Sequence, residues 1–355
     1  MQARVGGVDP DALAAAAHYP QAREAELQPV RGGLINQTWR FDGPGGCGIL
    51  QRLHPIFGAE LHHDIEAVTH RLAARGLDTP HLLRTHDDRL WVSGRDGTIW
   101  RALSFVPGVS MDRADDPARL REAGALLGRF HIALADLDHE FRFRRAAVHD
   151  TDAHLAALTE TSGQPGAELA PARALADRIL ERASALRPLP TLPTRVLHGD
   201  PKLNNIRFDA AGEEAVCLID LDTLRRGPLA HELGDAWRSW CNRAGEDEDR
   251  ARFDLGFLNA AAQGYASTAG RLVTRAEAES LLVGLERICL ELAARFCTDV
   301  FEDRYFGWDP DRYPSRRAHN LVRAGGQLSL HEEVVAVRDE AQQVVAGAFS
   351  AAGSR

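Results

Sequence analysis

The densest group of chemically active side chains in this 355-residue chain lies in two short stretches, His198-Gly199-Asp200-Pro201-Lys202-Leu203-Asn204-Asn205 and Ile219-Asp220-Leu221-Asp222. They combine a carboxylate at Asp200, a cation at Lys202, an amide at Asn205 and a second carboxylate at Asp220. Phosphoryl transfer from ATP needs a base that orients the acceptor hydroxyl, a cation on the moving group and oxygen ligands for Mg²⁺. The two stretches therefore predict phosphoryl transfer with ATP and Mg²⁺ as cofactors.

Lys202 is the only lysine among the 42 basic residues of the chain. The phosphate loop Gly-x-x-x-x-Gly-Lys-Ser/Thr is therefore absent. The 51 acidic residues give a formal net charge of −9, which argues against nucleic acid as a partner. Five scattered cysteines without a Cys-x-x-Cys spacing indicate neither a disulfide framework nor a zinc site. No apolar leader and no run of about 18 apolar residues is present, so we expect a cytoplasmic protein without membrane contact.

Periodicity divides the chain into a strand-rich front part and a helical back part. In the front part we expect strands near 34–41, 49–53, 90–92 and 98–105, and a helix over 61–74. In the back part we expect helices over 116–134, 171–186, 251–268, 275–301 and 326–346, with short strands at 207–208 and 216–219. The fold class predicted is α+β, with a small strand-rich lobe at 1–103, a hinge at 104–110 and a larger, mainly helical lobe at 111–355.

The spacing His-x-Asp-x-Lys-x-x-Asn matches the catalytic loop of protein kinases, with Asp220 in the place of their metal-binding aspartate. Together the two stretches resemble the aminoglycoside phosphotransferase and choline kinase superfamily, small-molecule kinases on a two-lobed protein-kinase-like fold. The stretches that are also similar to N-acetylhexosamine 1-kinases are Gly33-Leu34-Ile35-Asn36-Gln37-Thr38, Ile49-Leu50-Gln51-Arg52, Lys202-Leu203-Asn204-Asn205, Leu218-Ile219-Asp220-Leu221-Asp222-Thr223 and His319-Asn320-Leu321-Val322-Arg323. The resemblance implies that Asp200 is the base, that Lys202 contacts the γ-phosphate, and that Asn205 and Asp220 bind Mg²⁺.

The front lobe is expected to hold ATP. Glycines allow a close approach of the backbone to phosphate, so we expect nucleotide contacts at Gly32 and Gly33, with Asn36 and Thr38 as polar neighbours. An ordinary hairpin turn would have the same composition. The segment 104–106 fits a hinge that binds adenine through its backbone, with Ser104 and Val106 as the contacts, and a plain connection between lobes is the alternative.

Kinases also use a front-lobe lysine that grips the α- and β-phosphates and pairs with a helix glutamate. This chain has no lysine there, so Arg52 or Gln51 takes its place. Alternation along the strand puts these two side chains on opposite faces, and the sequence does not decide which face meets ATP. Glu66, or otherwise Asp64, is the expected acidic partner on the helix that follows.

The acceptor is expected to be the anomeric hydroxyl of an N-acetylhexosamine or a related sugar. The resemblance places its contacts among Asp222, Arg238, Arg304, Tyr305, Arg316 and His319, a mixture of charged and aromatic groups that suits a sugar. A solvated arginine-rich surface is the alternative for each. Asp235 is expected to brace the catalytic loop, and His198 is either structural or chemical. The alternative functions are a kinase of another small alcohol, such as an amino alcohol, homoserine or an antibiotic, and a nucleotide-binding pseudokinase scaffold.

Overall fold

The structure is a computed structural model that describes residues 9–30, 35–144 and 148–353. Its contacts form two compact units, the first comprising Met1–Val106 with Asp138–Phe143 and the second Pro107–Leu137 with Arg144–Arg355. The segment Asp138–Phe143 was expected in the helical lobe, and this assignment is wrong. It belongs to the first unit because the buried carboxylate of Asp64 accepts hydrogen bonds from the backbone N–H groups of Arg142 and Phe143 at 2.9 Å each.

The first unit is built on one antiparallel sheet in the order β1-β2-β3-β5-β4. Its elements are α1 (Pro10–Ala16), β1 (Glu26–Val30), β2 (Gln37–Gly43), β3 (Gly46–Arg52), α2 (Leu61–Ala74), β4 (Val92–Ser93) and β5 (Ile99–Ser104). The helix predicted over 61–74 is thus confirmed as α2. The β2–β3 hairpin closes between Gly43 and Gly46, where Gly46 adopts a φ of 122° that favours glycine.

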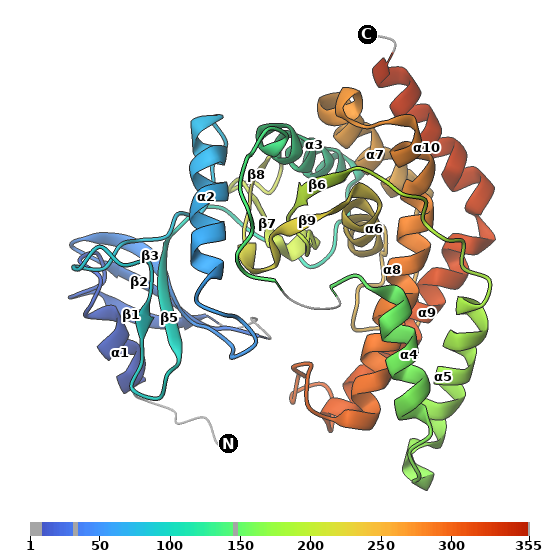
Figure 1. The fold of residues 1–355 in the computed structure, drawn as a ribbon, viewed down its shortest axis with the longest axis horizontal. Coiled ribbons are helices and arrows are strands. Elements are labelled where there is room, and N and C mark those ends of the chain that lie inside the picture. The colour runs from blue at the N-terminus through green and yellow to red at the C-terminus, as the bar shows by residue number, and fades with distance from the viewer. Residues whose placement is uncertain (1–8, 31–34, 145–147, 354–355) are drawn as a thin grey trace. The chain divides into compact units, whose positions relative to one another are not determined.

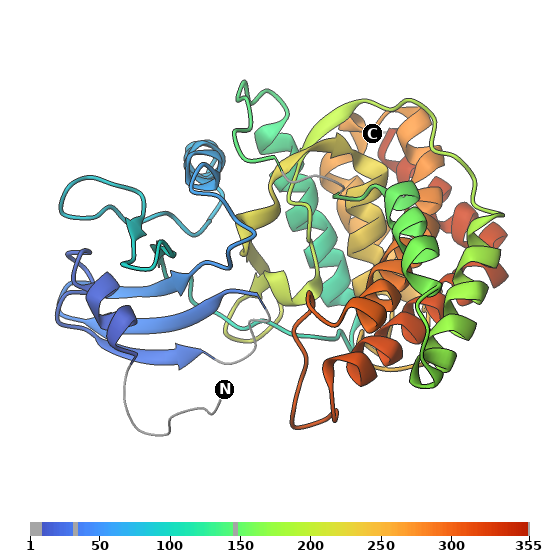
Figure 2. The same ribbon diagram turned by 60° about the horizontal axis from the view of Figure 1, so that its bottom comes forward.

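The sheet of the first unit has one apolar and one polar face because successive side chains alternate. The apolar face packs against α1, shown in dark blue in Figures 1 and 2, and its buried members include Trp39, Phe41, Leu50 and Trp100. On the opposite face, Thr38, Gln51 and Arg101 lie side by side on β2, β3 and β5. Strand register therefore sets three polar side chains in one row.

The second unit is mainly helical, with two small strand pairs, β6–β9 and β7–β8. Its helices are α3 (Pro117–Leu134), α4 (Thr151–Ser162), α5 (Ala170–Ala183), α6 (Leu229–Trp240), α7 (Leu255–Ala269), α8 (Arg275–Glu302), α9 (Arg316–Ala336) and α10 (Arg338–Gly353). Its strands are β6 (Thr194–Leu197), β7 (Ile206–Phe208), β8 (Ala215–Leu218) and β9 (Arg225–Pro228). The single helix expected over 326–346 is wrong, because the chain leaves helical geometry at Val337 without a glycine or proline to mark the break.

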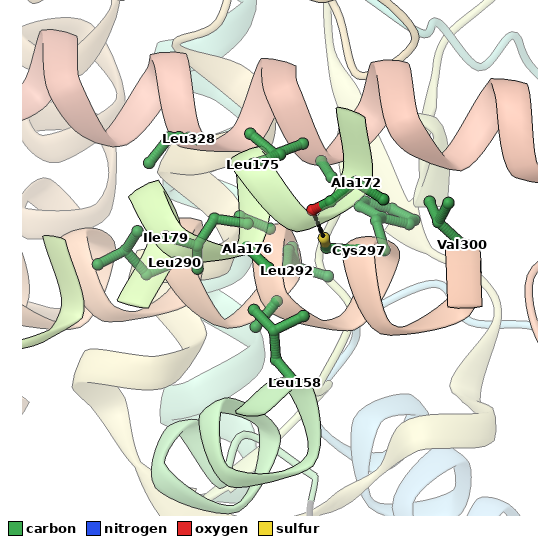
Figure 3. Packing of buried hydrophobic residues seen from close by; sticks show 14 of the residues in the cluster. Leu158, Ala172, Leu175, Ala176, Ile179, Leu290, Leu292, Cys297, Val300 and Leu328 are labelled. Atoms are coloured by element: carbon green, nitrogen blue, oxygen red, sulfur yellow. Dashed lines mark hydrogen bonds between the residues drawn. The ribbon is translucent and has the colours of Figure 1, made fainter. Parts of the chain in front are cut away.

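Helix α8 is the centre of the second unit and packs against α4, α5, α6 and α9 (Figure 1). It is buried along most of its length, and a capping box of Thr274 with Glu277 fixes its start. Figure 3 shows leucine and isoleucine side chains of α4, α5 and α8 converging, with the Cys297 thiol donating to the carbonyl of Ala172 at 3.5 Å. A Cβ on Gly284 would lie 2.0 Å from the carbonyl oxygen of Ala230, so glycine allows α6 to lie directly on α8.

Candidate active site

The catalytic loop predicted from the sequence follows strand β6 and leads into the β7–β8 hairpin. The amide of Asn205 donates to the Asp200 backbone carbonyl at 2.8 Å and to its carboxylate Oδ2 at 3.2 Å. At the other end of the hairpin, Ile219 donates its N–H to the carbonyl of Asn205 at 2.8 Å. The hairpin therefore brings Asp220, the next residue, to the same place as Asn205 and Asp200.

The single lysine lies in the same cluster. Lys202 Nζ is 3.1 Å from Asp200 Oδ2. The nearby Asp200 raises the pKa of Lys202 against the effect of burial, and Glu246 and Asp220 add to the increase. Burial alone would raise the pKa of Glu246, but Arg238 and Lys202 lower it to about 2. The lysine is therefore a permanent cation held among carboxylates.

Two backbone positions bring the loops of Asp200 and Asp220 together. Gly199 has a φ of 85°, and a Cβ there would lie 2.3 Å from the carbonyl oxygen of Thr223. Asp220 itself has a φ of 61°, a left-handed conformation that aspartate adopts more readily than most residues. The His198 ring Nε2 contacts the carbonyl of Ile219 at 2.9 Å, and Thr223 Oγ1 donates to the carbonyl of His198 at 2.9 Å. His198 is buried and joins the two loops, an arrangement that agrees with the structural alternative for this residue.

Glu232 on α6 braces the catalytic loop, a role that the sequence analysis gave to Asp235. Its carboxylate accepts the backbone N–H groups of His198 at 2.7 Å and Gly199 at 2.9 Å. Asp235 instead accepts from Arg238 Nε at 2.9 Å. The assignment to Asp235 is wrong because of the direction of the side chains on α6. Glu232, three residues before Asp235, is the residue whose carboxylate reaches the end of β6. The sequence signal was present, since Glu232 opens the motif Glu232-Leu233-Gly234-Asp235.

The charge of Glu232 is expected to stabilise the fold. Burial alone would raise its pKa, but His131, His198 and the N–H of Gly199 lower it from the ordinary value of 4.5 to about 2. A lowered pKa gives stability that is present above pH 4.5 and is lost as the pH falls through 2. We expect Glu232→Gln to reduce the free energy of unfolding at pH 7 by about 1–3 kcal/mol, because an amide leaves one buried N–H without an acceptor.

Urea denaturation of the wild type and Glu232→Gln at pH 7 and at pH 3 measures this effect. The difference should shrink at pH 3, where the unfolded carboxyl is already protonated. Glu279→Gln is the matched control, because that glutamate is exposed on α8 and its one ion pair within the described part of the chain is with the exposed Arg275 at 2.7 Å. Equal stability of Glu232→Gln and the wild type at pH 7 would contradict the bracing role.

The residues predicted to bind the acceptor are held by neighbouring groups of the second unit. Arg238 is buried and contacts Glu246 Oε2 at 2.8 Å, while His319 Nε2 lies 2.9 Å from Asp247 Oδ1. These two are therefore joined through adjacent acidic residues that the sequence analysis did not single out. The others contact the segment 299–303 or lie beside the catalytic loop: Arg304 pairs with Glu302, Arg316 donates to the carbonyl of Asp303, the Tyr305 N–H donates to Asp299, and Asp222 is buried after Asp220.

Among the predicted nucleotide contacts, Gly32 and Gly33 lie outside the described residues. Thr38 accepts from the amide of Gln51 at 3.3 Å, and Gln51 Oε1 accepts from Arg101 at 2.7 and 2.9 Å. Arg101 was not anticipated, although its place between Trp100 and Ala102 on a predicted strand is a sequence signal. Of the remaining predicted contacts, Asn36 accepts the N–H of His54 with its side-chain oxygen. The Ser104 hydroxyl accepts the N–H of His81, and the Ser104 N–H donates to the carbonyl of His81. Val106 ends the first unit.

The expected pairing of Arg52 with Glu66 is wrong. Arg52 points to the apolar face of the sheet, where it lies over Trp100 and contacts Asp96 Oδ2 at 2.8 Å. Glu66 pairs with Arg84 instead, in a hollow of about 570 Å³ in the first unit. The alternative partner, Asp64, is occupied by the segment Asp138–Phe143. Strand alternation decides this outcome, since Arg52 and Gln51 cannot face the same side.

Comparison with known proteins supports the fold. Residues 26–271 match the phosphotransferase enzyme family. The structure is similar to the microcompartment-associated aminopropanol kinase, with 17% identity, a TM-score of 0.62 and coverage of 92% of this chain and 97% of that chain. It is also similar to the amicoumacin kinase hAmiN in complex with AMP-PNP, Ca²⁺ and Ami, with 12% identity, a TM-score of 0.60 and coverage of 90% and 91%.

A further similar structure is choline kinase from Cryptosporidium parvum Iowa II, with 12% identity, a TM-score of 0.60 and coverage of 94% of this chain and 97% of that chain. These similarities confirm the predicted fold class, with a strand-rich first unit and a larger helical second unit. Over the residues that the structure describes, none of the helices combines the length and the apolar character needed to cross a bilayer.

Proposed function

Because the chain belongs to the phosphotransferase enzyme family, we propose that it transfers the γ-phosphoryl group of ATP to a hydroxyl of a small molecule. One observation carries the proposal: the carboxylate of Asp200 lies 3.1 Å from the only lysine of the chain and 3.2 Å from the amide of Asn205. A base, a cation and an oxygen donor for a metal are thus gathered around one atom, which is the set that this reaction requires.

Asp200 orients the acceptor hydroxyl and accepts its proton. The acceptor oxygen bonds to the γ-phosphorus while the bond from that phosphorus to the bridging oxygen of ADP breaks. Lys202 holds a positive charge beside the phosphoryl oxygens, and its pairing with Asp200 fixes its position before substrate binds. The gain in rate comes from positioning and electrostatics.

Mg²⁺ fits the residues present, because carboxylate and amide oxygens are the hard ligands that this ion prefers. We assign its binding to Asp220 and Asn205. The amide N–H groups of Asn205 donate to Asp200, so its amide oxygen is directed away from that carboxylate. Bound Mg²⁺ would neutralise charge on the nucleotide phosphates. In the first unit we assign the nucleotide to the polar face of the sheet, where Thr38, Gln51 and Arg101 form a row.

For the acceptor we propose the anomeric hydroxyl of an N-acetylhexosamine or a related sugar, on the strength of the sequence stretches similar to N-acetylhexosamine 1-kinases. Transfer of label from [γ-³²P]ATP to a panel of sugars, amino alcohols, homoserine and aminoglycosides tests this assignment. We expect a labelled sugar 1-phosphate, identified by its lability to mild acid. Labelling only of an amino alcohol or an antibiotic would replace the sugar, and MgATP binding without transfer to any acceptor or to water would indicate a scaffold.

A further inference from the structure

A second polar cluster lies in the helical unit, outside the group formed by Asp200, Lys202 and Asn205. It joins His149, which precedes α4, to Glu291 on α8, Arg225 on β9 and His231 on α6. His149 Nδ1 is 3.1 Å from Glu291 Oε1, and the rings of His149 and His231 are 5.7 Å apart between centroids. Thr151 Oγ1 donates to the other carboxylate oxygen of Glu291 at 3.0 Å. Both carboxylate oxygens of Glu291 therefore contact other groups of the protein.

Several polar atoms of this cluster are buried without a hydrogen-bond partner among the described residues: Arg225 Nε, Arg225 Nη2, His149 Nε2 and His231 Nδ1. His149 is only 8% exposed. Arg225 also has no carboxylate within ion-pair distance in the part of the chain that the structure describes, although burial lowers its pKa and Glu232, Glu291 and Asp235 oppose that effect from further away. Buried N–H groups without acceptors are costly, so they indicate a place for a ligand.

The backbone makes room for the Arg225 side chain. Arg225 and Gly227 lie two positions apart on β9 and so face the same side. A Cβ on Gly227 would lie 2.7 Å from Arg225 Nη1 and 2.9 Å from the side chain of Leu197. The glycine thus leaves space in which the guanidinium folds back along its own strand.

The Nε and Nη2 atoms of Arg225, which have no partner among the described residues, indicate which chemical group the ligand carries. Nε and Nη2 form the planar fork that binds a carboxylate or a phosphate through two parallel hydrogen bonds. The nearby carboxylate of Glu291 is held by His149 and Thr151, so it does not fill this fork. The unused nitrogens of His149 and His231 provide further hydrogen-bonding positions for the same ligand or for hydroxyl groups beside it.

The cluster also lies near the catalytic loop within the second unit. His231 and Asp235 are four residues apart on α6, on one face of the helix. Arg225 pairs with Leu197, three residues before Asp200, and Glu232, which follows His231 on α6, accepts the N–H groups of His198 and Gly199. A molecule whose hydroxyl meets Asp200 therefore has the cluster in its surroundings.

We propose that Arg225, with His149 and His231, forms an oxyanion-binding subsite for the acceptor, which carries a carboxylate or a phosphate in addition to the hydroxyl that is phosphorylated. This inference rests on the proposed function and narrows its acceptor class. An acidic sugar combines the anomeric hydroxyl with such a group. A carboxylate and a phosphate can both accept the two parallel hydrogen bonds of the guanidinium, so probes that carry one or the other are needed to tell which group the subsite binds.

Calorimetric titration of the full chain with D-glucose, D-glucuronate and D-glucose 6-phosphate tests the subsite, because these probes share a ring and differ in charge. We expect the wild type to bind one of the two anions about 10- to 100-fold more tightly than glucose, and Arg225→Met to lose that difference. Arg226→Met is the matched control on the same strand, since the exposed Arg226 side chain donates to the carbonyl of Leu137 at 2.7 Å and makes no other hydrogen bond to the described residues. It should keep the wild-type preference.

Arg225→Lys provides a second variant that keeps the charge and removes the fork, and it should lose most of the preference while remaining folded by circular dichroism. Equal affinity of the wild type and both Arg225 variants for each anion would overturn the subsite. It would mean that water, and not the acceptor, is the partner of the Arg225 N–H groups. Transfer of phosphate to neutral sugars with the same kcat/KM as to acidic ones would also overturn it, with the kinase function intact. If Arg225→Met loses anion binding as expected but the wild type does not bind MgATP, the subsite is supported and the kinase function is overturned.

Discussion

Asp200→Asn is expected to lower kcat by roughly 10² to 10⁴, equivalent to about 3–5 kcal/mol of transition-state stabilisation. Asparagine keeps the shape of the side chain but does not accept the acceptor proton. It also removes the negative charge that lies 3.1 Å from Lys202 Nζ. Steady-state kinetics with the best acceptor of the panel give kcat, and calorimetry gives the MgATP affinity, which should change little because Asp200 is itself assigned neither to the nucleotide nor to the metal.

Asp112→Asn is the matched control for this variant. Asp112 is an exposed aspartate whose Oδ1 accepts from the amide of Asn204, so it touches the same loop without reaching the cluster. Its turnover should stay within about twofold of the wild type, as is usual for exposed substitutions. Near-normal turnover of Asp200→Asn would remove Asp200 from the mechanism.

Asp220→Ala is expected to abolish the Mg²⁺-dependent part of nucleotide binding. The substitution removes the carboxylate proposed as a metal ligand and leaves the amide of Asn205 alone at the site. Calorimetry with ATP in the presence of Mg²⁺ and in the presence of EDTA separates the two contributions. The wild type should lose affinity when the metal is chelated, and the variant should show the same weak affinity in both conditions.

The backbone of Asp220 requires its own control, because alanine in the left-handed conformation costs about 1–2 kcal/mol. Asp88→Ala matches it, since Asp88 has the same φ of 61° and an exposed carboxylate. Asp220→Asn gives a second comparison that retains a residue suited to this conformation. Unchanged MgATP affinity in both Asp220 variants would contradict the metal role.

Local features of the sequence were sufficient for much of the fold. The catalytic loop was found because Asp200, Lys202 and Asn205 lie within six consecutive residues, and such short segments close on themselves by backbone geometry. Helix α2 was predicted at its observed limits because the apolar spacing ends at a glycine, Gly76, with a φ of 76°. The start of α3 was predicted from Asp116, whose side chain accepts the N–H of Ala118 as an N-cap.

Other outcomes depended on partners far apart in the chain. The pairing of β3 with β5, about 50 residues later in the chain, decides that Gln51 and not Arg52 faces Arg101. Alternation along β3 separates the two side chains but does not set the register between the strands. The choice of Glu232 over Asp235 as the brace depended on how α6 turns against the end of β6. The break at Val337 lacked a turn residue, and the two helices that it separates pack on different neighbours, α9 on α8 and α10 mainly on α7.

The sequence by itself was enough to predict the chemistry proposed for this protein, because the spacing of Asp200, Lys202, Asn205 and Asp220 matches the set of groups that phosphoryl transfer requires. It also determined the division into strand-rich and helical parts, since periodicity is a local property. The tertiary structure alone decided which buried charges are paired. Arg225, His149, His231 and Glu291 come from separate parts of the chain, and only the packing of α4 and α6 on α8, and of β9 on α6, brings them together. Their unused N–H groups follow from that packing and have no signature along the chain.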